Sequence, residues 1–170
     1  VVKYNITNKH FSLTYTWSGY NIVRSVLSGN VTATATIADA AYAFNLGTLG
    51  SLINMIGADT EFPLSATVNQ TTAITYDENN NPLYCLYRDG ISPANLCPNN
   101  IVTSISTGSI EATVTITLPE SVPMVGGMTY PYNRSIDLSG NESYTYTYNK
   151  QKLPETYTTG GLTYTYNYEQ

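Results

Sequence analysis

The chain has 170 residues, of which only 11% are charged, and its formal net charge is −5. This length is enough for one domain with its own core, whereas so sparse and acidic a set of charges excludes a surface built to attract nucleic acid or acidic lipid. Tyrosine is the dominant aromatic residue, with 16 copies against three Phe and one Trp. Because Tyr combines apolar area with a hydroxyl group, this bias is typical of half-exposed sheet faces and contact surfaces.

The first 17 residues contain two segments in which apolar and polar side chains alternate. The apolar residues of the first segment are Val2, Tyr4 and Ile6. After a polar break at residues 8–10, the alternation resumes on the other parity, at Phe11, Leu13, Tyr15 and Trp17. A period of two predicts strands with one buried face, and a strand at a chain end needs a partner to hold it. We predict that this partner is a second copy of the protein.

The next strands are predicted at residues 21–27 and 31–37, with a turn at residues 28–30 between them. Residues 38–57 are the one region with helical character, but three glycines within it argue against a single long helix. We therefore expect one or two short helical turns there, which cover an end of the sheet.

Strand patterns return near residue 63 and continue to the end of the chain. They predict two short strands within residues 63–75 and further strands at residues 82–88, 101–105, 110–118, 143–149 and 162–168. A turn is expected at residues 106–109, and the last two strands are ladders of alternating Tyr and Thr. Many short strands separated by Gly, Pro and Asn indicate an all-β fold, either a sandwich or an incomplete barrel.

Cys85 and Cys97 are the only cysteines, and the 11 residues between them are rich in turn formers. Two cysteines and one remote histidine do not make a structural zinc site. The spacing favours a local disulfide, which would stabilise the fold by on the order of 3 kcal/mol in the chain-entropy model. Such a bond implies an oxidising, extracytoplasmic location.

Five sequons for N-linked glycosylation are present, at Asn5, Asn30, Asn69, Asn133 and Asn141. Most lie in expected turns or on the polar parity of a strand, so that glycans there would face solvent. The chain begins with Val, which a cleaved signal peptide would explain, and no run approaches the roughly 20 apolar residues of a membrane span. We therefore expect a glycosylated protein of the cell surface.

Groups suited to catalysis or metal binding are scarce. His10 is the only histidine, and no catalytic motif accompanies it. Residues 77–81 form an oxygen-rich stretch, but it lacks the spacing and the glycine of a calcium loop, so a polar hairpin tip is expected instead. We therefore predict no enzymatic activity, no cofactor and no metal site.

An all-β chain with a free strand at its start resembles subunits that are joined by donor-strand complementation. In that arrangement a sandwich lacking one strand is completed by the terminal strand of a neighbour. In its overall plan, its Tyr, Thr and Asn content, its sequons and its processed-looking start, the sequence is most similar to the thread subunits of thermoacidophilic archaea. Those are glycosylated surface filaments whose fold is similar to that of bacterial type I pilins.

This resemblance implies an Ig-like or pilin-like β-sandwich, with residues 1–10 as an N-terminal donor strand and residues 11–170 as one domain. The side chains that would fill the groove of the next subunit are Val2, Tyr4, Ile6, Phe11 and Leu13. The implied function is that of a structural subunit of an extracellular filament. Identical subunits would polymerise head-to-tail, and the filament would serve adhesion or biofilm formation.

Other kinds of function stay open. One is a monomeric surface lectin or adhesin module, in which Tyr faces bind sugar. Another is a component of an S-layer or of a viral coat. Within the filament hypothesis, the ladder at residues 162–168 is the rival donor strand. A monomer that pairs its first strand with its own sheet is the competing folded state.

Overall fold

The computed structural model describes residues 4–36, 57, 60–84, 93–121 and 124–168. The elements in chain order are β1 (Tyr4–Ser18), β2 (Asn21–Thr36), β3 (Glu61–Asn80), α3 (Pro93–Leu96), β4 (Asn99–Thr117), β5 (Thr129–Asp137), β6 (Gly140–Ser143), β7 (Thr145–Tyr148), β8 (Pro154–Thr159) and β9 (Leu162–Thr165). This part of the chain is thus almost entirely strand, and the predicted all-β class is confirmed.

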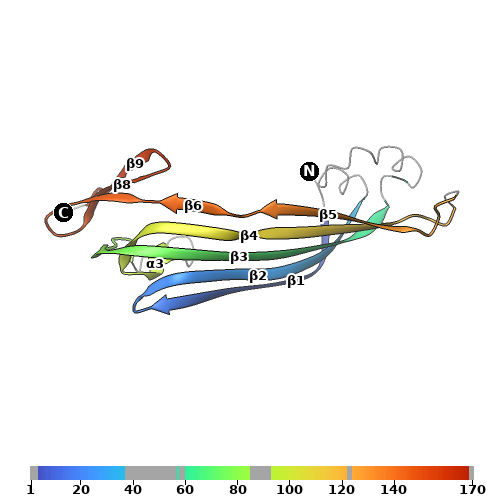
Figure 1. Cartoon of the computed structure of the whole chain (residues 1–170), viewed down its shortest axis with the longest axis horizontal. Helices are drawn as coiled ribbons and strands as arrows, with labels where there is room; N and C mark the ends of the chain where they lie inside the picture. The colour runs from blue at the N-terminus through green and yellow to red at the C-terminus, as the bar shows by residue number, and fades with distance from the viewer. Residues whose placement is uncertain (1–3, 37–56, 58–59, 85–92, 122–123, 169–170) are drawn as a thin grey trace. The chain divides into compact units, whose positions relative to one another are not determined.

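The strands form two antiparallel sheets. The first has the order β1-β2-β3-β4-β5, and β6 pairs with β4 beside β5 in the same sheet. The second has the order β7-β8-β9. Figure 1 shows β1 to β4 as long neighbouring ribbons, so each of these strands lies next to the one that follows it in sequence. This order is that of a meander.

The turn predicted at residues 28–30 is wrong, because β2 runs through it without a break. Gly29 has no positive φ, so it does not serve a turn. It instead makes room for β1: a Cβ at Gly29 would lie 2.3 Å from Cδ1 of Phe11 and 2.6 Å from the carbonyl oxygen of His10. Glycine within a strand often marks such a close approach of a neighbouring backbone.

The turn predicted at residues 106–109 is also wrong, since β4 is one strand from Asn99 to Thr117. Here the neighbouring strand is interrupted instead. Residues 109–117 of β4 pair with β5, residues 103–106 pair with β6, and between them the amide of Leu138 donates to the carbonyl oxygen of Gly108 at 3.0 Å. The two short strands predicted within residues 63–75 are likewise a single strand, β3.

The chain divides into two compact units. The first unit contains residues 1–12, 28–69 and 109–137, and the second contains residues 13–27, 70–108 and 138–170. Each of the strands β1 to β4 contributes residues to both units.

In the first unit, one face of the strands supplies the buried side chains. They alternate with polar residues along β2, β3 and β4 and are Ala33, Ala35, Phe62, Val114 and Ile116, followed by Leu118. The opposite parity of β2 and β4 carries threonines, such as Thr32 and Thr113. Burying a side chain of the size of Val114 or Ile116 contributes roughly 1.5–3 kcal/mol, so this alternation is what stabilises the sheet.

In the second unit, Ile22, Ile74 and Cys97 form a buried cluster, and Tyr15, Tyr76, Leu96 and Ile101 pack against it. The hydroxyl of Tyr76 donates to the carbonyl oxygen of Ile22 at 2.7 Å and lies 3.3 Å from Sγ of Cys97. Burial, followed by this contact with Cys97, raises the pKa of Tyr76 well above its ordinary value. The cluster therefore holds a neutral tyrosine whose polar end is satisfied.

The second sheet lies against β3 and β4 of the same unit. The hydroxyl of Tyr146 donates to the carbonyl oxygen of Ile101 at 3.0 Å, and the hydroxyl of Tyr148 donates to the carboxylate of Asp77. This contact between sheets gives the sandwich-like arrangement that was predicted.

Short helical turns were predicted at residues 38–57, of which only Gly57 lies within the described residues. Another helical turn, α3 at Pro93–Leu96, lies within the segment between the two cysteines, which was expected to form a loop. No helix among the described elements is both long enough and apolar enough to cross a bilayer.

Candidate functional site

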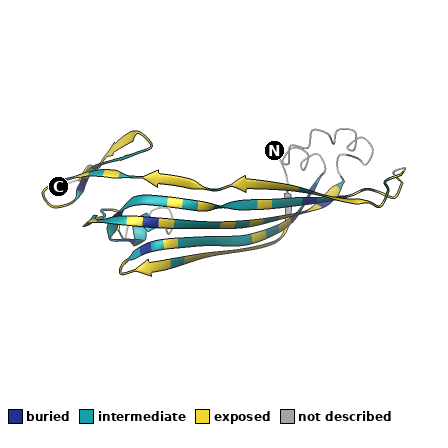
Figure 2. Ribbon diagram, in the orientation of Figure 1, coloured by how far each residue is buried: buried dark blue, intermediate teal, exposed yellow. Residues whose placement is uncertain are grey.

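The first candidate site is the free edge of β1. Among the described strands, β1 pairs with β2 alone, so none of them occupies its other edge. Figure 2 shows β1 as exposed along most of its length. Four of its large apolar side chains are at least half exposed: Ile6 (60%), Phe11 (55%), Leu13 (53%) and Trp17 (50%). A long open edge with exposed apolar side chains is a template for pairing with another chain.

In this structure of a single chain, β1 is hydrogen-bonded to β2 of the same chain, which is the competing folded state of the filament hypothesis. That residues 1–10 serve as the donor strand for a second copy stays a prediction. The polar break predicted at residues 8–10 is absent, and β1 is continuous across it. Val2 lies outside the described residues, and Tyr4 begins the strand. The missed signal is Ser18-Gly19: Gly19 has a φ of +58°, which permits a tight turn directly into β2. Because this connection is so short, closing it costs little conformational entropy, which favours the pairing of β1 with β2.

Side chains add little to what holds β1 in place. Thr7 donates from its hydroxyl to the carbonyl oxygen of Thr32 at 3.0 Å, and the hydroxyls of Ser12 and Ser28 are 3.0 Å apart. Among the described side chains of β1, Tyr15 packs on a buried cluster, that of Ile22, Ile74 and Cys97. Phe11, Leu13 and Trp17 share the parity of Tyr15 but are at least half exposed. The strand is therefore held mainly by its backbone hydrogen bonds.

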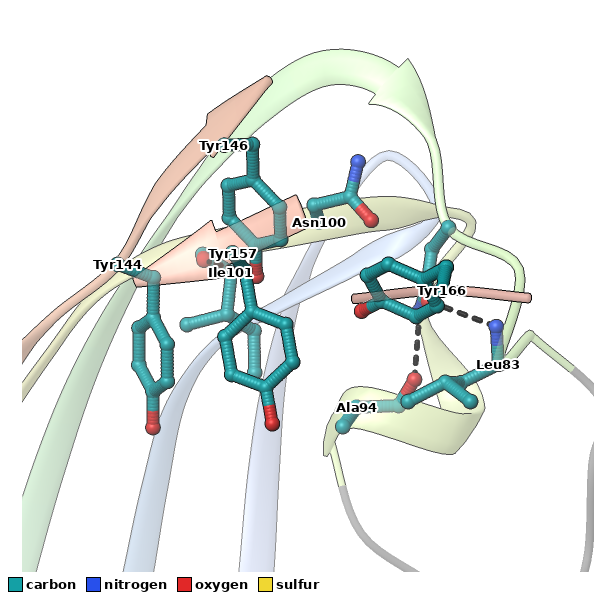
Figure 3. A pocket seen from close by; sticks show the side chains of 9 residues that line it. Leu83, Ala94, Asn100, Ile101, Tyr144, Tyr146, Tyr157 and Tyr166 are labelled. Carbon is teal, nitrogen blue, oxygen red and sulfur yellow. Dashed lines mark hydrogen bonds between the residues drawn. The ribbon is translucent and has the colours of Figure 1, made fainter. Parts of the chain in front are cut away.

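The second candidate site is a pocket of about 350 Å³ in the second unit. It is lined by four tyrosines together with residues from β4, from α3 and from the turn that follows β3. The lining residues are Asn81, Leu83, Ala94, Asn100, Ile101, Tyr144, Tyr146, Tyr157 and Tyr166. Figure 3 shows the rings of Tyr144, Tyr146 and Tyr157 gathered beside Ile101, with Leu83 and Ala94 across from them. We call this site the tyrosine pocket.

The alternation of Tyr and Thr explains why the rings meet there. Tyr146 of β7 is directly opposite Tyr157 of β8, which is directly opposite Tyr164 of β9. This register places the three rings in one row across the sheet. Tyr157 stacks on Tyr164 with ring centroids 4.7 Å apart and planes at 11°. It also lies 6.0 Å from Tyr146 and 5.7 Å from Tyr166, so it is the centre of the cluster.

Asn81 supports the rim of the tyrosine pocket. Its side-chain amide donates to the carbonyl oxygens of Ala94 and Cys97, at 2.6 and 2.8 Å, and its side-chain oxygen accepts from the amide of Leu83 at 2.9 Å. Figure 3 marks the bonds to Ala94 and Leu83 as dashed lines. The half-buried Asn81 thus connects the end of β3 to α3 and holds this wall of the pocket in position.

The tyrosine hydroxyls at the pocket fall into two groups. The hydroxyl of Tyr144 donates to the carboxylate of Glu142 at 2.7 Å, and that of Tyr146 donates to the carbonyl oxygen of Ile101 at 3.0 Å. Those of Tyr157 and Tyr166 make no hydrogen bond with any described residue. Burial, with smaller contributions from Tyr157 and Tyr168, raises the pKa of Tyr166 to about 12. At neutral pH this hydroxyl is therefore a neutral donor without a hydrogen-bond partner among the described residues.

The oxygen-rich stretch that starts at Asp77 is not a hairpin tip in this structure. Asp77 lies within β3, and its carboxylate accepts hydrogen bonds from the amide and side chain of Asn100 and from the hydroxyl of Tyr148. The oxygens of Asp77 therefore accept hydrogen bonds from residues of the protein itself. No group of three or more candidate metal ligands occurs among the residues that the structure describes. His10, expected in a polar break, is an exposed residue of β1.

The sequons lie on strands, whereas several of them were predicted in turns. Asn30 is in β2, Asn69 in β3, Asn133 in β5 and Asn141 in β6, and all four side chains are exposed. The backbone of Asn5 belongs to β1. Exposure satisfies the steric requirement for a glycan, and glycosylation itself stays a prediction.

Cys97 is a free cysteine in the structure and is completely buried. Its Sγ lies 3.1 Å from the backbone nitrogen of Ile22, which donates to it. Cys85 lies outside the described residues, so the disulfide between Cys85 and Cys97 stays a prediction.

Comparison of the chain with protein-family models, with curated proteins and with solved structures gave no significant match.

Proposed function

We propose that this chain is the structural subunit of an extracellular filament, in which β1 of one copy takes the place of β1 in the sheet of the next copy. The observation that supports this proposal is the state of β1. It is an edge strand with one partner strand, and four of its large apolar side chains are at least half exposed. A strand that is held by few side-chain contacts can leave its sheet at low cost.

Exchange between copies conserves the hydrogen bonds of the strand, because β2 of the neighbour offers the same backbone groups as β2 of the same chain. The turn at Gly19 then acts as the hinge that opens. A copy that gives its β1 to one neighbour and receives β1 from another makes head-to-tail contacts, which propagate, whereas reciprocal exchange between two copies would close into a dimer. The monomer with β1 in its own sheet is the precursor of this polymer.

The apolar side chains of β1 provide a reason for the polymer to be favoured over the monomer. Each of Ile6, Phe11, Leu13 and Trp17 has about half of its surface left to bury. At roughly 1.5–3 kcal/mol for complete burial of such a side chain, covering the remaining half contributes about 1 kcal/mol each. A contact between neighbouring copies along this edge would therefore stabilise each junction by about 3–5 kcal/mol.

A cross-link between β1 and β2 of the same chain tests strand exchange directly. The hydroxyls of Ser12 and Ser28 are 3.0 Å apart on neighbouring strands, so the double variant Ser12→Cys, Ser28→Cys is suited to a disulfide. Oxidised as a monomer, this variant should not form filaments in negative-stain images, and reduction should restore them. Oxidation after assembly should instead join neighbouring copies covalently, which a non-reducing gel detects.

The single variant Ser12→Cys is the matched control, because it carries the same substitution without a cross-strand partner. It should polymerise like the unmodified chain under both redox conditions. Filaments that form equally well from the cross-linked monomer would refute strand exchange. A second test compares two deletions. Removal of residues 1–18 should abolish polymerisation, whereas removal of residues 162–168, the rival donor strand, should leave it intact.

The cellular setting belongs to the same proposal. Exposed sequons on β2, β3, β5 and β6 suit a protein that is glycosylated on its way to the cell surface. Adhesion or biofilm formation is the role that a filament of such subunits would serve. Mass spectrometry of native material tests the glycans, and imaging of whole cells tests the location.

A further inference from the structure

We propose that the tyrosine pocket binds a neutral sugar ring of the pyranose type, with the hydroxyls of Tyr157 and Tyr166 as its hydrogen-bond partners. This inference is independent of strand exchange, because the pocket belongs to the second unit and contains no residue of β1.

The dimensions and the charge of the pocket define the class of ligand. Its volume of about 350 Å³ falls within the range of sites that bind small molecules. None of the residues that line it carries a formal charge at neutral pH. The walls consist of aromatic rings and aliphatic side chains, together with two asparagines. A neutral ring with one apolar face fits such walls, whereas an anion or a cation would find no counter-charge there.

The aromatic walls are held in place before any ligand arrives. Each of three lining tyrosines is stacked on a tyrosine that does not line the pocket: Tyr146 on Tyr148, Tyr157 on Tyr164, and Tyr166 on Tyr168. In addition, the hydroxyl of Tyr168 donates to the carbonyl oxygen of Pro154 at 2.8 Å. Rings that are already ordered lose little entropy when a ligand packs on them.

The free hydroxyls decide between a sugar and a purely apolar ring. An apolar ligand would remove water from the hydroxyls of Tyr157 and Tyr166 and give them no partner among the described residues. A buried polar group left without a hydrogen bond is costly, and this penalty would oppose binding. A pyranose packs its C–H face on the rings and offers hydroxyl groups to both tyrosines.

Saturation-transfer NMR on the full chain is a suitable test, with the methyl glycosides of glucose, galactose and mannose as probes. Toluene, which carries no hydroxyl group, serves as the purely apolar probe. We expect transfer to at least one methyl pyranoside and perturbation of the ring resonances of Tyr157 and Tyr166. No transfer to any of the three pyranosides, or transfer to toluene alone, would overturn the proposal.

Variants that remove one hydroxyl while keeping the ring separate recognition from folding. Tyr166→Phe and Tyr157→Phe should each weaken binding of the responding pyranoside by roughly five- to tenfold. Tyr132→Phe is the matched control, because Tyr132 lies in β5 and does not line the pocket, and this variant should bind the pyranoside with unchanged affinity. Far-ultraviolet circular dichroism verifies that each variant is folded. Equal affinity in all three variants would show that the hydroxyls do not recognise the ligand and would overturn the assignment.

Discussion

Replacing Gly29 with alanine tests how closely β1 approaches β2. The added Cβ would lie 2.3 Å from Cδ1 and 2.9 Å from Cε1 of Phe11, and 2.6 Å from the carbonyl oxygen of His10. Rotation of the Phe11 ring relieves the first two contacts, but the third involves backbone and requires β1 to move. Overpacking of this kind costs about 1–3 kcal/mol. The cost falls on the pairing of β1 with β2, because Gly29 and its neighbours belong to these two strands.

Amide hydrogen exchange followed by NMR measures this loss where it occurs. A decrease of about 1–3 kcal/mol in the free energy of opening corresponds to exchange that is roughly 5- to 150-fold faster for the amides of β1. Gly140→Ala is the control, since an added Cβ there meets nothing within 4 Å. That variant should keep the exchange rates of β1 unchanged and raise overall stability by about 0.4–1 kcal/mol through the unfolded chain.

The double variant Phe11→Ala, Gly29→Ala identifies which contact matters. It removes the ring but leaves the backbone oxygen of His10 in place, so protection of β1 should return only in part. Exchange in Gly29→Ala that is no faster than in Gly140→Ala would refute the close approach of the two strands. Complete recovery in the double variant would show that the ring alone determines the fit.

Three further predictions concern the cores and the tyrosines. Tyr76→Phe removes the hydroxyl that donates to the carbonyl oxygen of Ile22, and it should lower the free energy of unfolding in urea by about 1–3 kcal/mol. Ile116→Ala leaves a cavity at a side chain that is only 1% exposed, and it should cost about 2–5 kcal/mol in the same assay. Burial raises the pKa of Tyr166 to about 12, so the folded chain holds this proton more tightly than the unfolded chain, whose Tyr pKa is about 10. The ionisation of Tyr166 should therefore leave the free energy of unfolding unchanged below about pH 10 and lower it between about pH 10 and 12. Urea midpoints measured across this range should decrease more in the unmodified chain than in Tyr166→Phe.

The sequence by itself determined the class of the fold and which side chains of β2, β4 and β7 share one face. Alternation along residues 31–37 and 110–118 puts Ala33 and Ala35 on one face of β2, and Val114 and Ile116 on one face of β4, and all four are buried. The Tyr and Thr ladders likewise placed Tyr144, Tyr146 and Tyr148 on one side of a strand, where they approach β3 and β4. A period of two is a local property, so one sequence is enough to read it.

Only the tertiary structure decided where strands end and what they pair with. Gly29 and Gly108 have the chemistry of turns, yet one makes room for Phe11 and the other lies where β4 changes its partner from β6 to β5. The tyrosine pocket was not predicted because Asn81, Ala94 and the ladder tyrosines are distant in sequence and meet only when the second sheet lies on the first. The partner of β1 was likewise decided by the tertiary structure. Alternation shows which side chains of a strand share a face, but it does not show which other strand pairs with it. The tight turn at Gly19 favours β2, because closing so short a loop costs the least entropy.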